Sequence, residues 1–232
     1  MVNLTRIYTR TGDSGTTRLS DMPLARKTDP RVEAYGAVDE ANSILGMVVT
    51  RSDLPEQVRA VLRHIQNELF DAGADLSNPL RPDPPFEPLR IVQPSIDRLE
   101  GWCDEFGEAL PALRSFILPG GTFTAALLHQ ARSVVRRAER AAWRAADAYG
   151  HEPAATPDSD GGVNPLAITY LNRLSDLLFI LARVVGQQAG DVLWVPGTDR
   201  TPSDPRGKAQ RERLVNRADA GTPDPEAQPP AN

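Results

Sequence analysis

Two stretches decide the fold of this chain: TFTAALLHQARSVVRRAERAAWRAADA (residues 122–148) and PLAITYLNRLSDLLFILARVVGQQA (residues 165–189). Neither has a proline in its interior, and in both, leucines, valines or alanines recur every three or four positions. This spacing is typical of amphipathic α-helices that bury one face. We therefore expect two long, packed helices in the second half of the chain.

Three shorter stretches have the same helical spacing, at residues 32–50, 55–75 and 95–109. The dipeptide Asp29-Pro30 is a typical start signal for the first of them, and Ser95 is a favourable N-cap for the third. Strand signals are almost absent. Helices with one apolar face bury it most simply against each other, so the sequence predicts an all-α protein, a five-helix bundle.

Proline-rich stretches separate these helices. Residues 76–94 form one break, and the Gly/Pro-rich residues 150–165 predict a long surface loop. From Pro196 onward the chain has few large apolar residues, so burial cannot offset the entropy of ordering it. We expect a helical-bundle domain over residues 1–197 and a disordered, proline-rich tail over residues 198–232.

The composition excludes several classes of protein. The chain has 232 residues and a net charge of −5, from 26 Lys+Arg and 31 Asp+Glu, which argues against a nucleic-acid binder. One cysteine and three widely spaced histidines exclude a disulfide framework and make a metal site built from the protein alone improbable. No leader and no apolar run of about 20 residues is visible, so we expect a cytoplasmic protein without a membrane span.

The first candidate site is the N-terminal run TRTGDSGTTR, residues 9–18. Glycines and threonines present many backbone N–H and hydroxyl donors without bulky side chains, so such a loop can wrap a phosphate chain. Lys27 follows in the same irregular segment as a point charge. The run lacks the spacing of a Walker A motif. The alternative is an exposed, turn-rich arm with no ligand.

The second candidate is a stripe of the helix over residues 122–148. Arg132, Arg136 and Glu139 lie within a narrow arc, with Arg137 and Arg140 beside it. Two arginines one turn apart can hold an oligophosphate, and Glu139 is near enough to orient one of them. The alternative is a solvated helix face with Arg–Glu pairs.

Polar residues on the apolar helices are the third candidate. One face of the last helix holds Asn172, Ser175, Asp176 and Phe179, and the first helix holds Asp39 and Glu40. They are either groups of a site or contacts between helices, and Asp39 is a plausible partner for an arginine of the other long helix. Cys103 and His129 are interpreted as packing residues.

Three blocks occur together and in order: IYTRTGDSGTT with RKTDPRVEAYGAVDEANSILG, then SFILPGG with HQARSVVRRAER, then YLNRLSDLLFILAR. In this combination the sequence closely resembles the PduO-type ATP:cob(I)alamin adenosyltransferases over roughly residues 5–195. It departs from the family in two places. Ser14 stands where the family often has a lysine, and LSDMPLAR replaces the usual glycine-rich continuation before Lys27.

The resemblance implies a trimer-forming five-helix bundle with active sites at the subunit interfaces. It implies an irregular N-terminal nucleotide-binding arm and a catalytic set of Arg132, Arg136 and Asp39, the last paired with Arg132 across the interface. The residues it assigns to ATP are Thr9, Arg10, Thr11, Gly12, Asp13, Gly15, Thr17, Arg18, Lys27, Arg136, Arg137, Glu139, Arg140 and Asn172.

The resemblance also implies that Phe116 and Phe179 bind cobalamin, Phe116 filling the lower face of the corrin and keeping its axial base away. Cobalamin is a substrate, and Mg²⁺ arrives with ATP. The expected partners are ATP, cob(I)alamin and cob(II)alamin, two further copies of the chain, a reductase and an adenosylcobalamin-dependent mutase. Two alternatives remain: a non-catalytic trimer that delivers or senses the cofactor, and a helical oligomerisation module without a ligand.

Overall fold

The computed structural model describes residues 8, 10–19, 24–84, 86–156 and 159–197. The chain divides into two compact units: residues 1–112 with 119–191, and residues 113–118 with 192–232. Thr9 and the predicted tail, residues 198–232, lie outside the described residues, so the disorder and the boundary at residue 197 stay predictions.

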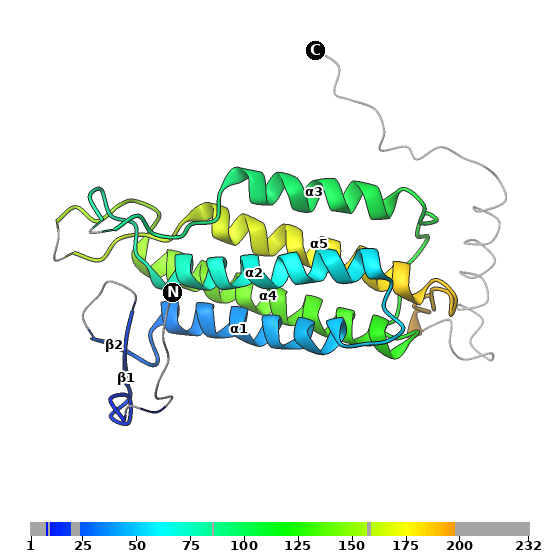
Figure 1. Cartoon of the computed structure of the whole chain (residues 1–232), viewed down its shortest axis with the longest axis horizontal. Helices are drawn as coiled ribbons and strands as arrows, with labels where there is room; N and C mark the ends of the chain where they lie inside the picture. Colours follow the sequence, from blue (N-terminus) through cyan, green and yellow to red (C-terminus); the bar gives the residue numbers. More distant parts are fainter. Residues whose placement is uncertain (1–7, 9, 20–23, 85, 157–158, 198–232) are drawn as a thin grey trace, which may run out of the picture. The chain divides into compact units, whose positions relative to one another are not determined.

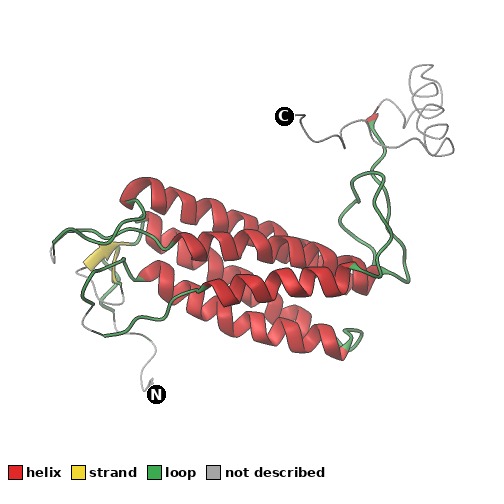
Figure 2. Cartoon of the chain, turned by 90° about the horizontal axis from the view of Figure 1, so that it is seen from above, coloured by secondary structure: helices red, strands yellow, loops and turns green. Residues whose placement is uncertain are grey.

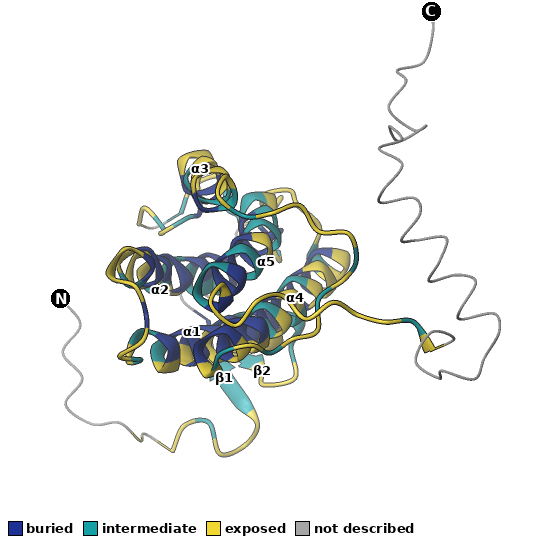
Figure 3. Ribbon diagram, turned by 90° about the vertical axis from the view of Figure 1, so that its right-hand side faces the viewer, coloured by how far each residue is buried: buried dark blue, intermediate teal, exposed yellow. Residues whose placement is uncertain are grey.

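Five helices make up most of the first unit, which confirms the all-α prediction. They are α1 (Pro30–Val49), α2 (Glu56–Ser77), α3 (Gln93–Gly107), α4 (Phe123–Tyr149) and α5 (Pro165–Gly186). Helix α1 packs against α2 and α4, and α5 packs against α4 and α3 (Figure 1). Seen along the bundle, each helix turns its buried face inward (Figure 3).

The α1–α4 contact is built from alanines. Ala34 and Ala41 of α1, and Ala131, Ala138 and Ala141 of α4, are completely buried. Small side chains on both surfaces let two helix axes approach closely. Helix α5 contacts α4, α3 and α2, and its residues Leu174, Leu177, Leu178 and Leu181 are fully buried.

Capping residues define where several helices begin. The Asp29 carboxylate accepts a hydrogen bond from the Arg31 backbone N–H at 2.8 Å, which confirms the predicted start of α1. Asn164 caps α5 in the same way. The prediction for Ser95 is wrong: α3 begins at Gln93 after Val92, and Ser95 is buried inside the helix.

The N-terminal arm is not wholly irregular. Strands β1 (Thr16–Arg18) and β2 (Leu24–Arg26) pair in antiparallel register, Thr16 opposite Arg26 and Arg18 opposite Leu24. The hairpin, yellow in Figure 2, lies at the end of the bundle where α1 begins, as the labels of Figure 1 show. The threonines of β1 suit a strand, but three residues are too few for a clear strand pattern in the sequence.

The predicted surface loop over residues 150–165 is partly buried, which corrects that expectation. Gly161, Gly162 and Val163 are inaccessible to solvent. The Leu80 N–H donates to the Gly162 carbonyl at 3.0 Å, and the Ala154 N–H donates to the Leu80 carbonyl at 2.9 Å. The two proline-rich breaks therefore pack on each other.

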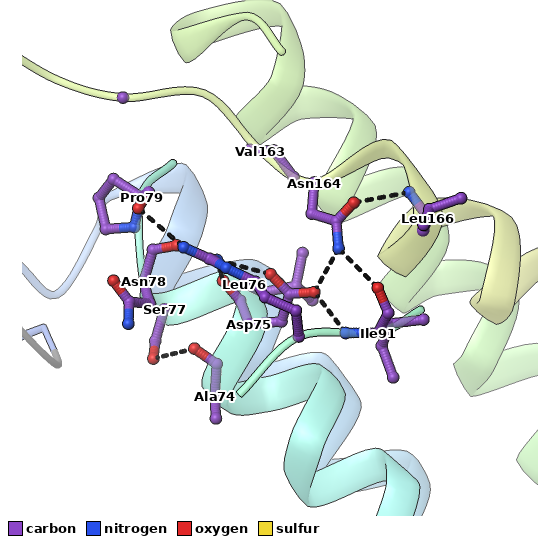
Figure 4. A network of polar contacts seen from close by, with 12 residues as sticks. Ala74, Asp75, Leu76, Ser77, Asn78, Pro79, Ile91, Val163, Asn164 and Leu166 are labelled. Atoms are coloured by element: carbon purple, nitrogen blue, oxygen red, sulfur yellow. Dashed lines mark hydrogen bonds and ion pairs between the residues drawn. The ribbon is translucent and has the colours of Figure 1, made fainter. Parts of the chain in front are cut away.

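A buried carboxylate joins these breaks to the helices (Figure 4). Asp75, on α2, pairs with the Arg90 guanidinium at 2.6 Å and accepts from the Asn164 amide at 2.7 Å and the Ile91 N–H at 2.8 Å. Burial raises the pKa of Asp75, and these donors oppose that shift. The network ties α2, the start of α3 and the start of α5 together.

Helix α5 is long and apolar enough to cross a membrane by length and composition. More than half of its most apolar window is buried inside the protein. Its apolar character therefore matches its place in the core of the bundle.

Candidate nucleotide and corrinoid site

The described part of the N-terminal loop is a series of tight turns. The Gly15 N–H donates to the Gly12 carbonyl at 3.2 Å, and the Lys27 N–H donates to the Gly15 carbonyl at 2.9 Å. Gly15 has a φ of 82° and Arg10 a φ of 61°, both in the left-handed region. Such turns are typical of backbone concavities that bind anions.

Lys27 lies directly over this loop. A β-carbon added at Gly12 would be 3.0 Å from the Lys27 ammonium nitrogen and 3.1 Å from its ε-carbon. Glycine at position 12 therefore allows the lysine to approach, and the cation and the turn form one cradle. The predicted ATP residues from Arg10 to Lys27 are thus brought together, within the described residues, at one end of the bundle.

The hairpin is attached to α1 through Tyr35. The Tyr35 side chain hydrogen-bonds to Thr17, and burial raises the pKa of Tyr35. Arg18, Leu19 and Tyr35 line a pocket of about 550 Å³ between α1 and α2, together with Asp39, Asn42 and others. Asp39 has no ion-pair partner among the described residues of this chain.

The arginines of α4 differ in their surroundings. The Arg132 guanidinium lies over the Phe179 ring of α5, 5.4 Å from its centre, and Arg136 is exposed to solvent. Arg137 forms an ion pair with Glu40 of α1. Arg140 donates to the backbone carbonyl of Arg136 at 3.0 Å. Arg132 and Arg136 thus have no carboxylate partner within the described part of the chain.

Among the described residues of this chain, Glu139 contacts Asn172 and forms no ion pair with an arginine. It accepts a hydrogen bond from the Asn172 amide at 3.1 Å, and the Asn172 carbonyl accepts from Arg173 at 2.9 Å. Arg173 in turn pairs with Glu100 of α3 at 2.7 Å. Asn172 and Glu139 are therefore held in place by a chain of contacts across α4, α5 and α3.

The packing interpretations of His129 and Cys103 fit their surroundings. His129 is buried, and its ring meets the Phe179 ring edge-on at 6.1 Å. Burial and the nearby Arg132 lower the pKa of His129, and burial raises the pKa of the Cys103 thiol to about 11. Both groups are neutral near pH 7, as packing residues should be.

The second unit holds Phe116, described here by itself. The Phe116 side chain is 80% exposed and meets the Trp194 ring at 6.4 Å. The Trp194 N–H donates to the Phe116 carbonyl at 2.7 Å, and Ile117 is bridged to Leu193. Phe116 is therefore not among the residues of the apolar core of this chain.

Several residues of this region escaped the sequence reasoning. Trp194 lies in the VLWVPG segment, next to the predicted tail, where no periodic pattern marks it. Tyr149 and Arg31 also contact each other near the start of α1. In the sequence, each is an ordinary residue at the end of a helix. Among the described residues, no group of three or more His, Cys, Asp or Glu side chains is arranged to hold a metal ion.

Comparison with known proteins gives the class of this fold and site. The family model for cobalamin adenosyltransferase matches residues 7–185. The chain therefore belongs to the cobalamin adenosyltransferase family.

Individual relatives agree over almost their whole length. The corrinoid adenosyltransferase of Mycobacterium tuberculosis is 58% identical over 202 residues, covering 87% of this chain and 99% of the relative. The cobalamin adenosyltransferase of Cupriavidus metallidurans is 46% identical, covering 82% of this chain and 95% of the relative.

Solved structures show the same fold. A phenylalanine-to-alanine variant of the PduO-type ATP:corrinoid adenosyltransferase from Lactobacillus reuteri, complexed with cobalamin and ATP, is 35% identical with a TM-score of 0.70. It covers 82% of this chain and 100% of that chain. An arginine-to-lysine variant of that enzyme, complexed with ATP, gives 36% identity and a TM-score of 0.68, over 81% and 99% of the two chains.

Proposed function

We propose that this protein transfers the 5′-deoxyadenosyl group of ATP to cob(I)alamin, giving adenosylcobalamin and triphosphate. The observation that carries the proposal is a pair of arginines, Arg132 and Arg136, that have no carboxylate partner among the described residues, on a fold shared with ATP-bound adenosyltransferases. A scaffold that only binds a neutral ligand has no need for two uncompensated charges on one helix face.

The reaction requires no nucleophile or general base from the protein. The Co(I) electron pair attacks C5′ of ATP, a Co–C bond forms, and the C5′–O bond breaks with its electrons going to the triphosphate. Cobalt is itself the nucleophile, so the chain needs no general base. Its task is to hold both substrates in line and to stabilise charge on the leaving oxygen.

The residues divide this task between them. The loop and its lysine hold the phosphates, and Arg132 and Arg136 stabilise the leaving triphosphate. Mg²⁺ enters with ATP, on phosphate oxygens, and supplies further positive charge. Loss of one such donor typically costs about 3 kcal/mol in the transition state.

Phe116 and Phe179 are proposed to contact the corrin. An apolar side chain on the lower face keeps water and the axial base from cobalt, which eases reduction of Co(II) to Co(I). The exposure of Phe116 supports this, because an aromatic ring that is 80% exposed is free to meet a ligand.

We further propose a homotrimer in which Asp39 of one subunit meets Arg132 of the next. Both charges lack an ion-pair partner within the described part of the chain. Large apolar side chains are also exposed on α1, α2 and α4 of the first unit: Met47, Phe70 and Trp143. We expect the protein to act in the cytoplasm. We also expect a reductase to supply its reduced cobalamin and a mutase to use the adenosylcobalamin that it makes.

One assay tests the function. The purified protein is mixed with ATP, Mg²⁺ and chemically reduced cobalamin, and the corrin spectrum is followed. Wild type should form adenosylcobalamin, and Arg136→Ala should lose about a hundredfold or more in turnover. Arg144→Ala, another exposed arginine of α4, is the matched control and should keep full activity. Binding without turnover in the wild type would support the delivery or sensing role instead.

A further inference from the structure

Tyr149, the last residue of α4, is linked to the nucleotide loop although it is not part of it. Its hydroxyl donates to the Asp29 carboxylate (Oη to Oδ2, 2.6 Å). Its ring lies against the Arg31 guanidinium, 4.4 Å from the ring centre. The Tyr149 hydroxyl thus contacts Asp29 and the Tyr149 ring contacts Arg31. Both residues lie where the chain passes from β2 into α1.

Asp29 connects this contact to Lys27. Its second carboxylate oxygen caps α1 through the Arg31 N–H at 2.8 Å. Its backbone N–H donates to the Arg26 carbonyl at 2.9 Å, closing the turn of residues 26–29 that contains Lys27. Both side-chain oxygens of Asp29 are therefore committed, one to the helix start and one to Tyr149.

Arg31 gives this junction a fixed support. Its side chain is only 2% exposed, and its guanidinium donates to the carbonyls of Gly161 and Gly162. Burial lowers the pKa of Arg31. The ring of Tyr149 covers one face of this buried cation, so the position of the phenol is set by the bundle and not by the arm.

We propose that Tyr149 is a positioning residue for ATP binding: through Asp29 it holds the turn that keeps Lys27 over Gly12. The inference rests on the proposed function, because it assigns the Gly12–Lys27 cradle to the triphosphate. Tyr149 itself touches no reacting atom. Burial and the Asp29 hydrogen bond raise the pKa of Tyr149 to about 12, so its hydroxyl remains a donor at the pH of any assay.

The test compares two tyrosines. Tyr149→Phe keeps the ring on Arg31 and removes only the bond to Asp29. Tyr170→Phe is the matched control: its hydroxyl also donates to a carboxylate, Glu68, at 3.0 Å, but it lies in the core between α2 and α5. The dissociation constant for MgATP is measured by calorimetry without cobalamin, with KM for ATP, kcat and melting temperature.

Tyr149→Phe should raise the dissociation constant and KM for MgATP at least fivefold, with kcat at saturating ATP within twofold of wild type. Tyr170→Phe should leave both ATP constants unchanged. Unchanged ATP constants in Tyr149→Phe, or equal changes in the two variants, would overturn the positioning role.

A double-mutant cycle tests whether Tyr149 acts through Lys27. Lys27→Ala alone should weaken MgATP binding, and adding Tyr149→Phe should weaken it no further. Additive losses would overturn the coupling. If Lys27→Ala binds MgATP as wild type does, the cradle is not the phosphate site and the inference fails, whereas absent turnover with normal ATP binding counts against the proposed function alone.

Discussion

At the scale of single residues, the structure separates groups whose role is chemical from groups whose role is structural. Phe116 is an apolar residue that the protein leaves exposed, and Asp75 is a charged residue that it buries. Large apolar side chains are usually buried and charged side chains usually exposed, so each of these two positions needs a specific explanation. For Phe116 we propose that the explanation is a ligand, and for Asp75 it is a set of hydrogen-bond donors.

Phe116→Ala should separate reduction from transfer. Without the ring, water or the cofactor's own base can reach cobalt, so activity that starts from Co(II) with a weak reductant should fall steeply. Transfer from chemically reduced Co(I) should survive much better, because ATP and the arginines are untouched. Melting temperature should hardly change, since the side chain is 80% exposed. Equal losses in the two assays would contradict the axial-face assignment.

Asp75→Ala should destabilise the protein by about 3–5 kcal/mol, because Arg90 and Asn164 would lose their shared acceptor in a buried site. The free energy of unfolding from urea titration measures this. Asp83→Ala, at an exposed aspartate of the loop, is the control and should change it by less than about 0.5 kcal/mol.

The raised pKa of Asp75 also predicts in which direction the stability of the protein changes with pH. Its pKa is raised in the folded state above the ordinary value of 3.8, so the protonated form is favoured by folding. Its contribution to stability is full below pH 3.8 and is lost as the pH rises through the folded pKa. Wild type should therefore lose stability relative to the non-titrating Asp75→Asn variant over that range. A difference that is independent of pH, or that grows in the wild type's favour, would contradict the raised pKa.

At the scale of elements, the loops at one end of the bundle are part of its core. The segment over residues 150–165 meets the segment over residues 78–92: Asn164 of the first donates to the Ile91 carbonyl of the second. Arg31 of α1 donates to the Gly162 carbonyl and so joins the first segment to α1. The loops therefore position the start of α1, and with it the arm that carries the proposed nucleotide cradle.

Gly161→Ala should break this contact, because the added β-carbon would stand 1.9 Å from the Leu80 carbonyl oxygen. Backbone must move to relieve the clash, so we expect a loss of about 3 kcal/mol or more in the free energy of unfolding. Gly101→Ala, at an exposed and open position of α3, should instead stabilise by about 1 kcal/mol. A neutral Gly161→Ala would show that the two loops do not pack closely.

At the scale of the whole molecule, the proposed trimer can be tested by measuring the mass of the protein in solution. Sedimentation at micromolar concentration should give a mass near three times the 25.3 kDa of the chain. Asp39→Arg should place two positive charges at each interface, dissociate the trimer and abolish turnover. Glu33→Arg, elsewhere on the exposed side of α1, is the control. A trimer that persists in Asp39→Arg would show that Asp39 does not face Arg132.

Local chemistry explains what could be predicted. The five helices follow from apolar spacing, and the start of α1 from the cap at Asp29, because both signals act within one helical turn. The Gly-rich loop and the arginine stripe are local patterns too. Ser95 shows the limit: it has the chemistry of an N-cap, yet a proline one position earlier already starts the helix.

The sequence alone determined the helical class, the order of the five helices and the residue types of the candidate site. Only the tertiary structure decided that Arg31 is buried beneath Tyr149, that Gly161 must be glycine, and that Lys27 lies over Gly12. Arg31 and Gly161 are 130 positions apart, and Asp75 and Asn164 are 89 apart. Periodicity reports which face of an element is apolar, but it carries no information on which distant element covers that face; packing of the whole chain decides that.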